Sequence, residues 1–189
     1  MKTTVKIIST LLVLYIGFVA YVFKTIPEDM LVIHATSKEY DPNFTASLIP
    51  KSLVRETFKL TGFKGCTPES DPVSPSTWLM TLVSGYDSGD IDFENVTIFI
   101  DIVLEQGCDI NEKSIDGMTA LHSTGLFGNA RMAEYLLQKG ADPYVRIERP
   151  GKNSHEMTAL QLAQFVHEKD KDPRYKEVIE VLGQAITEK

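Results

Sequence analysis

The stretch Asp116-Gly117-Met118-Thr119-Ala120-Leu121-His122 decides the fold of this 189-residue chain. Part of it returns as Met157-Thr158-Ala159-Leu160, and Gly140-Ala141-Asp142 lies between the two copies. That closing motif follows an earlier Gly107-Cys108-Asp109 by 33 positions. Self-similarity at a fixed spacing of this size is typical of repeat proteins, in which each unit packs only on its neighbours.

Residues 116–148 resemble the ankyrin repeat, whose pattern is an Asp-Gly-x-Thr-Pro-Leu-His opening, two short antiparallel helices and a closing Gly-Ala-Asp. The resemblance implies a first helix over 120–127, a turn at 128–129 and a second helix over 131–139. It also implies a structural role for His122, whose ring would hydrogen-bond to backbone in the repeat turn.

The copies on either side match the pattern less closely. Six extra residues fall within 147–156, and 167–172 replaces a short turn. The helices expected in these two copies cover 76–84, 95–106, 159–166 and 173–186. We therefore expect a mostly α-helical fold with about three ankyrin repeats over 76–189, the outer two being degenerate because terminal repeats cap the stack.

The N-terminus is typical of a membrane anchor. Lys2 and Lys6 precede an apolar run over 7–23. As a helix this run spans roughly 26 Å, slightly less than the ~30 Å hydrocarbon core of a bilayer. Tyr21 and Lys24 can extend it, because aromatic and long basic side chains sit well at the membrane interface.

Two alternatives to an uncleaved anchor stay open. A cleaved signal peptide needs small residues one and three positions before the cut, and a cut after Ala20 would place Phe18 at the third position. The run could also be a buried core helix. The lack of a small-x-small pair near its end favours the uncleaved anchor.

Charge predicts the orientation of this anchor. Basic residues stay on the cytoplasmic side, and Lys2 and Lys6 flank the run on one side, whereas Glu28 and Asp29 follow it. The rest of the chain should then lie outside the cytoplasm, in the periplasm of a bacterium with the anchor in the inner membrane. A net charge of −7 without a run of Lys and Arg argues against a nucleic-acid partner.

The segment between the anchor and the repeats lacks a clear long period. Several prolines punctuate it, and one helix is expected to begin at Pro50, with Leu53, Val54 and Phe58 on its apolar face and Leu60 as a further candidate for that face. The domain organisation we expect is an anchor over 1–26, a non-repeat segment and linker over 27–75, and a repeat domain over 76–189.

The two cysteines, Cys66 and Cys108, are too few for a disulfide framework and lack metal-site spacing. Two unlinked thiols, with Cys108 buried as a small apolar residue, are the favoured interpretation. In an oxidising compartment a single bridge becomes plausible, and it would stabilise the fold by about 4 kcal/mol. The sequence does not decide between them.

No catalytic or metal-binding motif is found. The chain has no Gly-x-Ser-x-Gly elbow, phosphate loop or Cys-x-x-Cys, and His155-Glu156 lacks a second histidine four residues on. We therefore expect no enzyme, no cofactor and no metal site. A hydrolase with a site in the segment before 75 is the enzymatic alternative.

The resemblance implies that a protein partner binds the loop fingertips and the exposed face of the first helices. The candidate contact residues are Lys113, Ile115, Met118, Ser123, Leu126, Phe127, Asn129, Arg146, Arg149 and Lys152. Leu126 and Phe127 would anchor an interface, unless the segment before Pro75 folds back over them. Arg146, Arg149 and Lys152 form either a contact patch or an ordinary solvated loop.

The leading functional hypothesis is a protein-binding module held at the outer face of the inner membrane. Small exported ankyrin proteins of this layout resemble immunity proteins, so the partner could be a toxin enzyme delivered by a neighbouring cell. The alternative is a periplasmic scaffold or stress-protection protein that binds a resident envelope partner. The resemblance to immunity proteins is an analogy of family and topology.

Overall fold

The computed structural model describes residues 2–37, 49–68, 76–87 and 91–187. These residues form nine α-helices and no strand, which confirms the expected mostly α-helical fold. The helices are α1 (Lys2–Thr25), α2 (Glu28–Thr36), α3 (Lys51–Thr61), α4 (Trp78–Asp87), α5 (Phe93–Glu105), α6 (Ala120–Phe127), α7 (Ala130–Gln138), α8 (Ala159–Asp170) and α9 (Arg174–Thr187).

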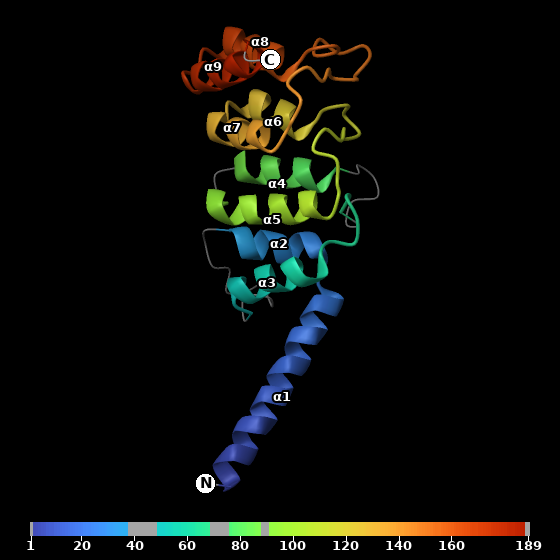
Figure 1. Ribbon diagram of the computed structural model, residues 1–189, viewed down its shortest axis with the longest axis vertical. Helices are drawn as coiled ribbons and strands as arrows, with labels where there is room; N and C mark the ends of the chain where they lie inside the picture. Colours follow the sequence, from blue (N-terminus) through green and yellow to red (C-terminus); the bar gives the residue numbers. More distant parts are fainter. Residues whose placement is uncertain (1, 38–48, 69–75, 88–90, 188–189) are drawn as a thin grey trace.

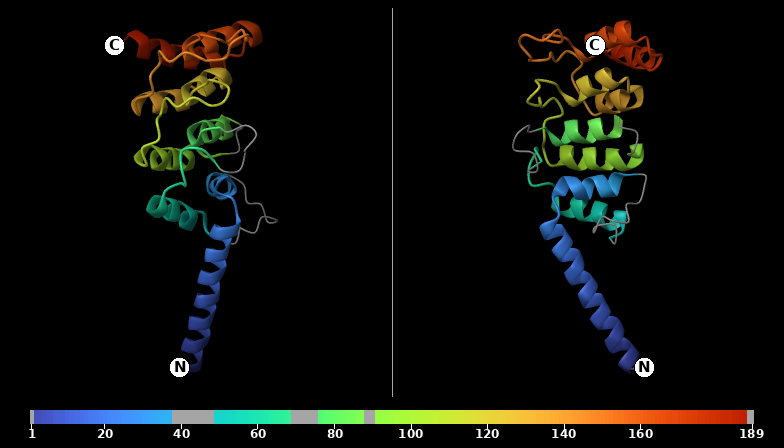
Figure 2. Two further views of the ribbon diagram at one scale, coloured as in Figure 1. Left: turned by 90° about the vertical axis from the view of Figure 1, so that its right-hand side faces the viewer. Right: turned by 180° about the vertical axis from the view of Figure 1, so that it is seen from behind.

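The last eight helices stack in four pairs, and α1 leaves the stack at the end formed by α2 and α3 (Figure 1). Helices α2, α4, α6 and α8 form one layer, whereas α3, α5, α7 and α9 form the other (left view of Figure 2). One hydrophobic core runs through the pairs, from Val54 in α3 to Leu182 in α9. Each pair therefore buries its apolar side against its neighbours, as in a solenoid.

The central pair matches the sequence-based expectation. Helix α6 spans Ala120–Phe127, and its first turn is closed by His122. The Nδ1 atom of His122 accepts a hydrogen bond from the Thr119 backbone N–H at 3.2 Å. This role places the ring hydrogen on Nε2, which donates to the Met157 carbonyl at 3.3 Å. Burial lowers the pKa of His122 to about 4, so the ring is neutral and structural at neutral pH.

The other predicted helices are present, with shifted ends. The largest shift is in α8, which continues to Asp170, so the expected replacement of a turn by 167–172 is wrong. No helix breaker precedes Lys171, and this residue ends the helix with a left-handed φ of 57°. Pro173 then follows, directly before α9.

Helix α2 was not predicted from the sequence. Its buried residues, among them Leu31, Val32 and Ala35, share one face, but the exposed Met30 and Ile33 make the opposite face apolar too, so the sequence shows no amphipathic period. It packs with α3 against α5, so the segment before the repeats adds a fourth pair to the stack. Core residues on both sides of residue 75 belong to one hydrophobic cluster. The domain boundary at this residue stays a prediction.

Gly125 lets α6 and α8 approach closely. A Cβ atom at this position would lie 2.6 Å from the Ala159 carbonyl oxygen, which is closer than side-chain carbons pack. We therefore expect Gly125→Ala to separate the two helices and to lower the free energy of unfolding by about 2 kcal/mol. Urea unfolding of the full chain in detergent micelles, followed by circular dichroism, measures this loss.

Gly183→Ala in α9 is the matched control. A Cβ atom there meets nothing within 4 Å, so its effect should be neutral or stabilising by up to about 1 kcal/mol. Equal urea midpoints for the two variants would show that the approach of α6 to α8 does not require Gly125.

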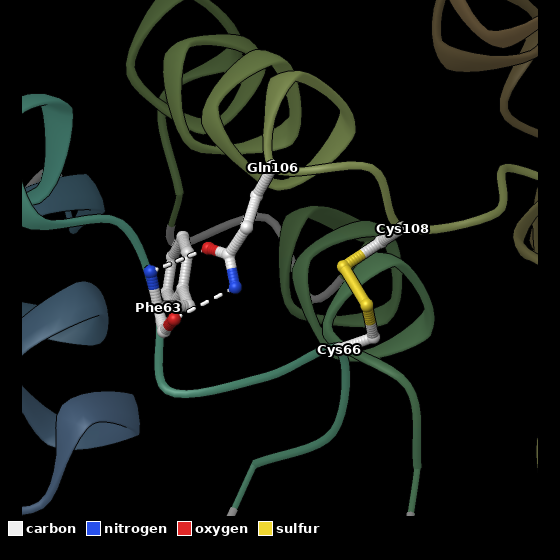
Figure 3. Close-up of a disulfide and its surroundings, with 4 residues drawn as sticks. All are labelled: Phe63, Cys66, Gln106 and Cys108. Atoms are coloured by element: carbon white, nitrogen blue, oxygen red, sulfur yellow. Dashed lines mark hydrogen bonds between the residues drawn. A yellow bond between two sulfur atoms is a disulfide. The ribbon is translucent and has the colours of Figure 1, made fainter.

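A disulfide joins Cys66 to Cys108, with their Cα atoms 5.5 Å apart (Figure 3). The expectation of two unlinked thiols is therefore wrong. Beside the disulfide, the Gln106 side chain accepts from the Phe63 N–H at 2.6 Å and donates to the Phe63 carbonyl at 2.7 Å. These links fasten the chain after α3 to the chain after α5. The backbone N–H of Trp78 donates to the Cys66 carbonyl at 2.9 Å, and this bond attaches the start of α4 to the same point.

Helix α1 carries an apolar window, Ile8–Thr25, that is long enough to cross a membrane and only 6% buried. The interpretation of this run as a buried core helix is therefore wrong. Only its last turns touch the stack, where Val22 is fully buried and Phe23 and Ile26 are partly buried. Two residues, Ile26 and Pro27, separate α1 from α2, so the junction is short.

Candidate functional site

Two loops project from the stack on the side where α5 joins α6 and α7 joins α8. We call 107–119 the first finger and 139–158 the second finger. The first finger closes in a tight turn, in which the Ser114 N–H donates to the Met118 carbonyl at 2.8 Å. Gly117 in this turn has a φ of 67°, and a Cβ atom there would lie 2.1 Å from the Glu148 carbonyl oxygen. Only glycine allows the two fingers to meet this closely.

The second finger has a stem and a longer tip. Its stem is held by two backbone hydrogen bonds, from the Ile147 N–H to the Met157 carbonyl and from the Glu156 N–H to the Ile147 carbonyl, each at 3.0 Å. Ile147 is fully buried at the base of the finger. The six extra residues fall within this finger, and the tip between Ile147 and Glu156 extends beyond the stem.

Charged side chains join the two fingers. Lys113 lies 2.5 Å from a carboxylate oxygen of Glu148, and Arg149 lies 2.8 Å from one of Asp116. The hydrogen bond from Lys113 lowers the pKa of Glu148 below its usual value. The Glu148 N–H also donates to the Gly117 carbonyl at 3.1 Å. These contacts order the fingertips, so a partner would meet a largely preformed surface.

The three basic residues of the second finger differ in their surroundings. Arg146 is exposed and donates to the Glu156 carbonyl at 2.7 Å, and Arg149 pairs with Asp116. Lys152 is exposed near the tip. Their role as a contact patch stays a prediction.

Exposed apolar side chains lie at both ends of α6, and Tyr144 in the second finger is 47% exposed as well. Phe127, at the end of α6, is 43% exposed, and Ile115, in the first finger, is 63% exposed. Leu126 and Met118 beside them are half-buried. Helices α2 and α3 pack on α5, on the far side of the α4–α5 pair from α6, so these helices do not fold back over Phe127 (Figure 1).

Ser123 does not belong to the exposed surface, contrary to the expectation from the sequence. It is 1% exposed, because α4 packs on α6 and the Ser84 hydroxyl lies 3.2 Å from the Ser123 hydroxyl. Asn129 is half-buried, and its side chain accepts from the Met132 N–H at 3.1 Å as the cap of α7. We therefore centre the candidate surface on Ile115 and Phe127.

A second exposed apolar group lies at the other end of the stack and was missed from the sequence. Met30 and Ile33 in α2 and Leu60 in α3 are exposed, and the last is 88% exposed. Their exposure follows from the position of the α2–α3 pair, because the described residues place no further helix pair beyond it. Met30 and Ile33 were missed because α2 was not predicted, whereas Leu60 was a candidate for the apolar face of α3, which is wrong.

The histidines and acids do not gather into a metal-binding group in the part of the chain that the structure describes. No group of three or more His, Cys, Asp and Glu side chains is close enough to hold a metal ion among these residues. Asp109 and Asp142 accept hydrogen bonds from the backbone N–H two residues on, at 2.9 and 3.0 Å. Both aspartates therefore support the turns in which they lie.

Residues 116–147 match the family model of the ankyrin repeat. The matched ankyrin repeat comprises the turn of the first finger, the α6–α7 pair and the stem of the second finger. It supports an ankyrin-repeat protein and, with it, a protein–protein interaction module. No curated protein matches the chain.

Proposed function

We propose that this chain is a single-pass membrane protein whose ankyrin stack lies outside the cytoplasm and binds another protein. The observation that carries the proposal is the junction of an exposed apolar helix with an interaction module. The 18-residue window of α1 is 6% buried, and a helix with so much exposed apolar surface is stable in a bilayer, not in water. The chain passes from α1 to the first helix of the stack through two residues, Ile26 and Pro27.

The disulfide supports a location outside the cytoplasm. Cys66 and Cys108 are bonded, and such bonds persist in oxidising compartments, whereas the cytoplasm keeps thiols reduced. The charge pattern around α1 gives the same orientation, with Lys2 and Lys6 before the helix and Glu28 and Asp29 after it. In a bacterium with two membranes, this compartment is the periplasm.

The redox state of the two cysteines in living cells tests this orientation. Thiols are trapped with acid and then labelled with a polyethylene-glycol maleimide, which adds mass for each free cysteine. We expect no label on the full chain unless reductant is added first, and two labels on a chain that lacks residues 1–26 and stays in the cytoplasm. Two free thiols in the full chain would contradict the proposed location.

The proposed binding surface is the face that carries Phe127 and Ile115. Exposed aromatic and aliphatic side chains beside ordered loops are typical anchors of protein interfaces. We expect Phe127→Asp to weaken binding by at least about 2 kcal/mol, or roughly 30-fold, because it places a charge where an apolar side chain is desolvated. Gln184→Asp on the exposed side of α9 is the control and should bind like the unchanged chain.

Retention of the partner from native membranes by immobilised full-length chain measures this effect. A partner held equally by the unchanged chain and by Phe127→Asp would move the interface away from the end of α6. Circular dichroism of both variants checks that helix content is unchanged.

We propose that the partner is a secreted antibacterial toxin, so that the chain acts as an immunity protein. A compact neutralising domain held at the membrane suits this task, and the acidic net charge of −7 suits a basic partner. Co-expression with the toxin encoded beside its gene should relieve toxicity, whereas Phe127→Asp should not. A growth defect on deletion in pure culture, without an attacker, would instead favour a periplasmic scaffold or stress-protection role.

A further inference from the structure

Two adjoining clefts lie where α1 meets the first helix pair of the stack. Their volumes are about 300 and about 410 Å³, and both are lined by Phe23, Glu28 and Lys64. Each falls within the range of ligand pockets, about 300 to 1,000 Å³. The described protein atoms leave room here for a ligand of the size of a fatty acyl chain.

The walls of the larger cleft are mainly apolar. Phe23 contributes from α1, Leu31 from α2, and Phe58 and Phe63 from α3 and the chain that follows it. Phe23 belongs to the apolar window of α1, which ends at Thr25. If α1 spans a membrane, this cleft therefore opens at the boundary between the hydrocarbon core and water.

The mouth of the smaller cleft carries both signs of charge. Lys24 and Lys64 line it together with Glu28 and Asp29, and Glu28 accepts a hydrogen bond from the Lys64 backbone N–H at 3.4 Å. A phospholipid head group with a phosphate and an ammonium matches this mixture. A head group that bears only negative charge would be repelled by the carboxylates of Glu28 and Asp29.

Exposed apolar side chains continue from the cleft over the end of the stack. Thr57 and Thr61 of α3 line the larger cleft, so this face of α3 looks toward α1. Leu60 stands beside Thr61, three residues after Thr57, and is 88% exposed. A leucine in this position is costly in water but favourable in contact with acyl chains.

We infer that the paired clefts bind one zwitterionic phospholipid of the membrane that α1 spans, with an acyl chain between Phe23 and Phe63 and the phosphate beside Lys24. The inference rests on the proposed function, because it requires α1 to lie in the bilayer. The lipid fills the space between the anchor and the first helix pair. It thereby stiffens the junction and fixes the direction in which the stack stands on the membrane.

The chain contains its own reporter for this site. Trp78 is the one tryptophan of the chain and is 1% exposed in α4, behind the first pair. Its ring centroid lies 4.5 Å from that of Phe63, which lines the cleft. Bromine atoms on an acyl chain quench tryptophan fluorescence only at short range, so a brominated chain in the cleft would quench Trp78.

The test uses the full chain in vesicles of phosphatidylethanolamine and phosphatidylglycerol, recovered by flotation. We expect brominated phosphatidylethanolamine to quench Trp78, and brominated phosphatidylglycerol at the same content to quench it less. Thr61→Phe, which fills the larger cleft from an exposed position, should lose the quenching. Thr187→Phe on α9 should retain it. Thr57→Leu is a second variant that fills the same cleft, and it replaces Thr61→Phe if that substitution disturbs the end of α3.

The outcomes separate the lipid site from the anchor. Chain that floats with the vesicles but shows no quenching, or equal quenching with and without Thr61→Phe, overturns the lipid site and leaves the anchor intact. Equal quenching by the two lipids overturns the zwitterionic head group. Chain that does not float overturns both the anchor and the lipid site.

Discussion

Reduction of the Cys66–Cys108 disulfide is expected to lower the free energy of unfolding by about 4 kcal/mol, the largest single effect anticipated for this chain. The bond closes a loop with a sequence separation of 42 residues, so it removes many conformations from the unfolded chain. The loop contains α4 and α5, and the two Gln106–Phe63 hydrogen bonds beside the disulfide contribute much less than the bond itself.

Urea unfolding of the full chain in detergent micelles, with and without a reductant, measures this loss. A chain with Cys66→Ser and Cys108→Ser is the control, because it should already be destabilised and should no longer respond to the reductant. Identical urea midpoints for the oxidised and the reduced unchanged chain would show that the disulfide does not stabilise the stack.

Acidification is expected to remove about 3 kcal/mol of stability through His122. Its pKa is lowered by burial to about 4 in the folded chain, against an ordinary value of 6.5. The unfolded chain therefore binds more protons than the folded chain between pH 6.5 and 4. The contribution of His122 is complete above pH 6.5, falls as the pH is lowered to about 4, and falls no further below that.

The chain supplies a matched control for this titration. Gln161 occupies the position of His122 in the next repeat, and its side chain accepts from the Thr158 N–H at 3.0 Å in the same capping arrangement. His122→Gln should keep the cap without titrating, so the difference in unfolding free energy between the two chains should change by about 3 kcal/mol from pH 7 to pH 4. A difference that is constant over this range would contradict a buried neutral imidazole.

The central repeat could be predicted because its motif residues act locally. Thr119 and His122 close the first turn of α6, and the left-handed φ of 97° at Gly140 suits the residue that follows the second helix. Asp142 accepts from the N–H two residues on. None of these contacts needs a distant part of the chain, so the motif residues and the resemblance to the ankyrin repeat were sufficient to place the helices.

The remaining features depend on contacts between segments that are far apart in the sequence. Ser123 is buried because Ser84, 39 positions earlier, lies against it. The disulfide depends on a Cα separation of 5.5 Å that no sequence pattern encodes. Ile115 and Phe127, by contrast, were placed on the exposed surface correctly, because their positions in the repeat motif point away from the neighbouring helices.

The central claim is that a partner protein binds the face of the stack formed by the end of α6 and the first finger, while α1 holds the stack on a membrane. Photo-cross-linking in native membranes tests it most directly, with a benzophenone amino acid placed at position 127, or at position 180 on the exposed side of α9. We predict a discrete protein adduct from position 127, found in the membrane fraction and absent from position 180. Adducts of equal yield from both positions, or none from position 127 while position 180 reacts, would contradict the account.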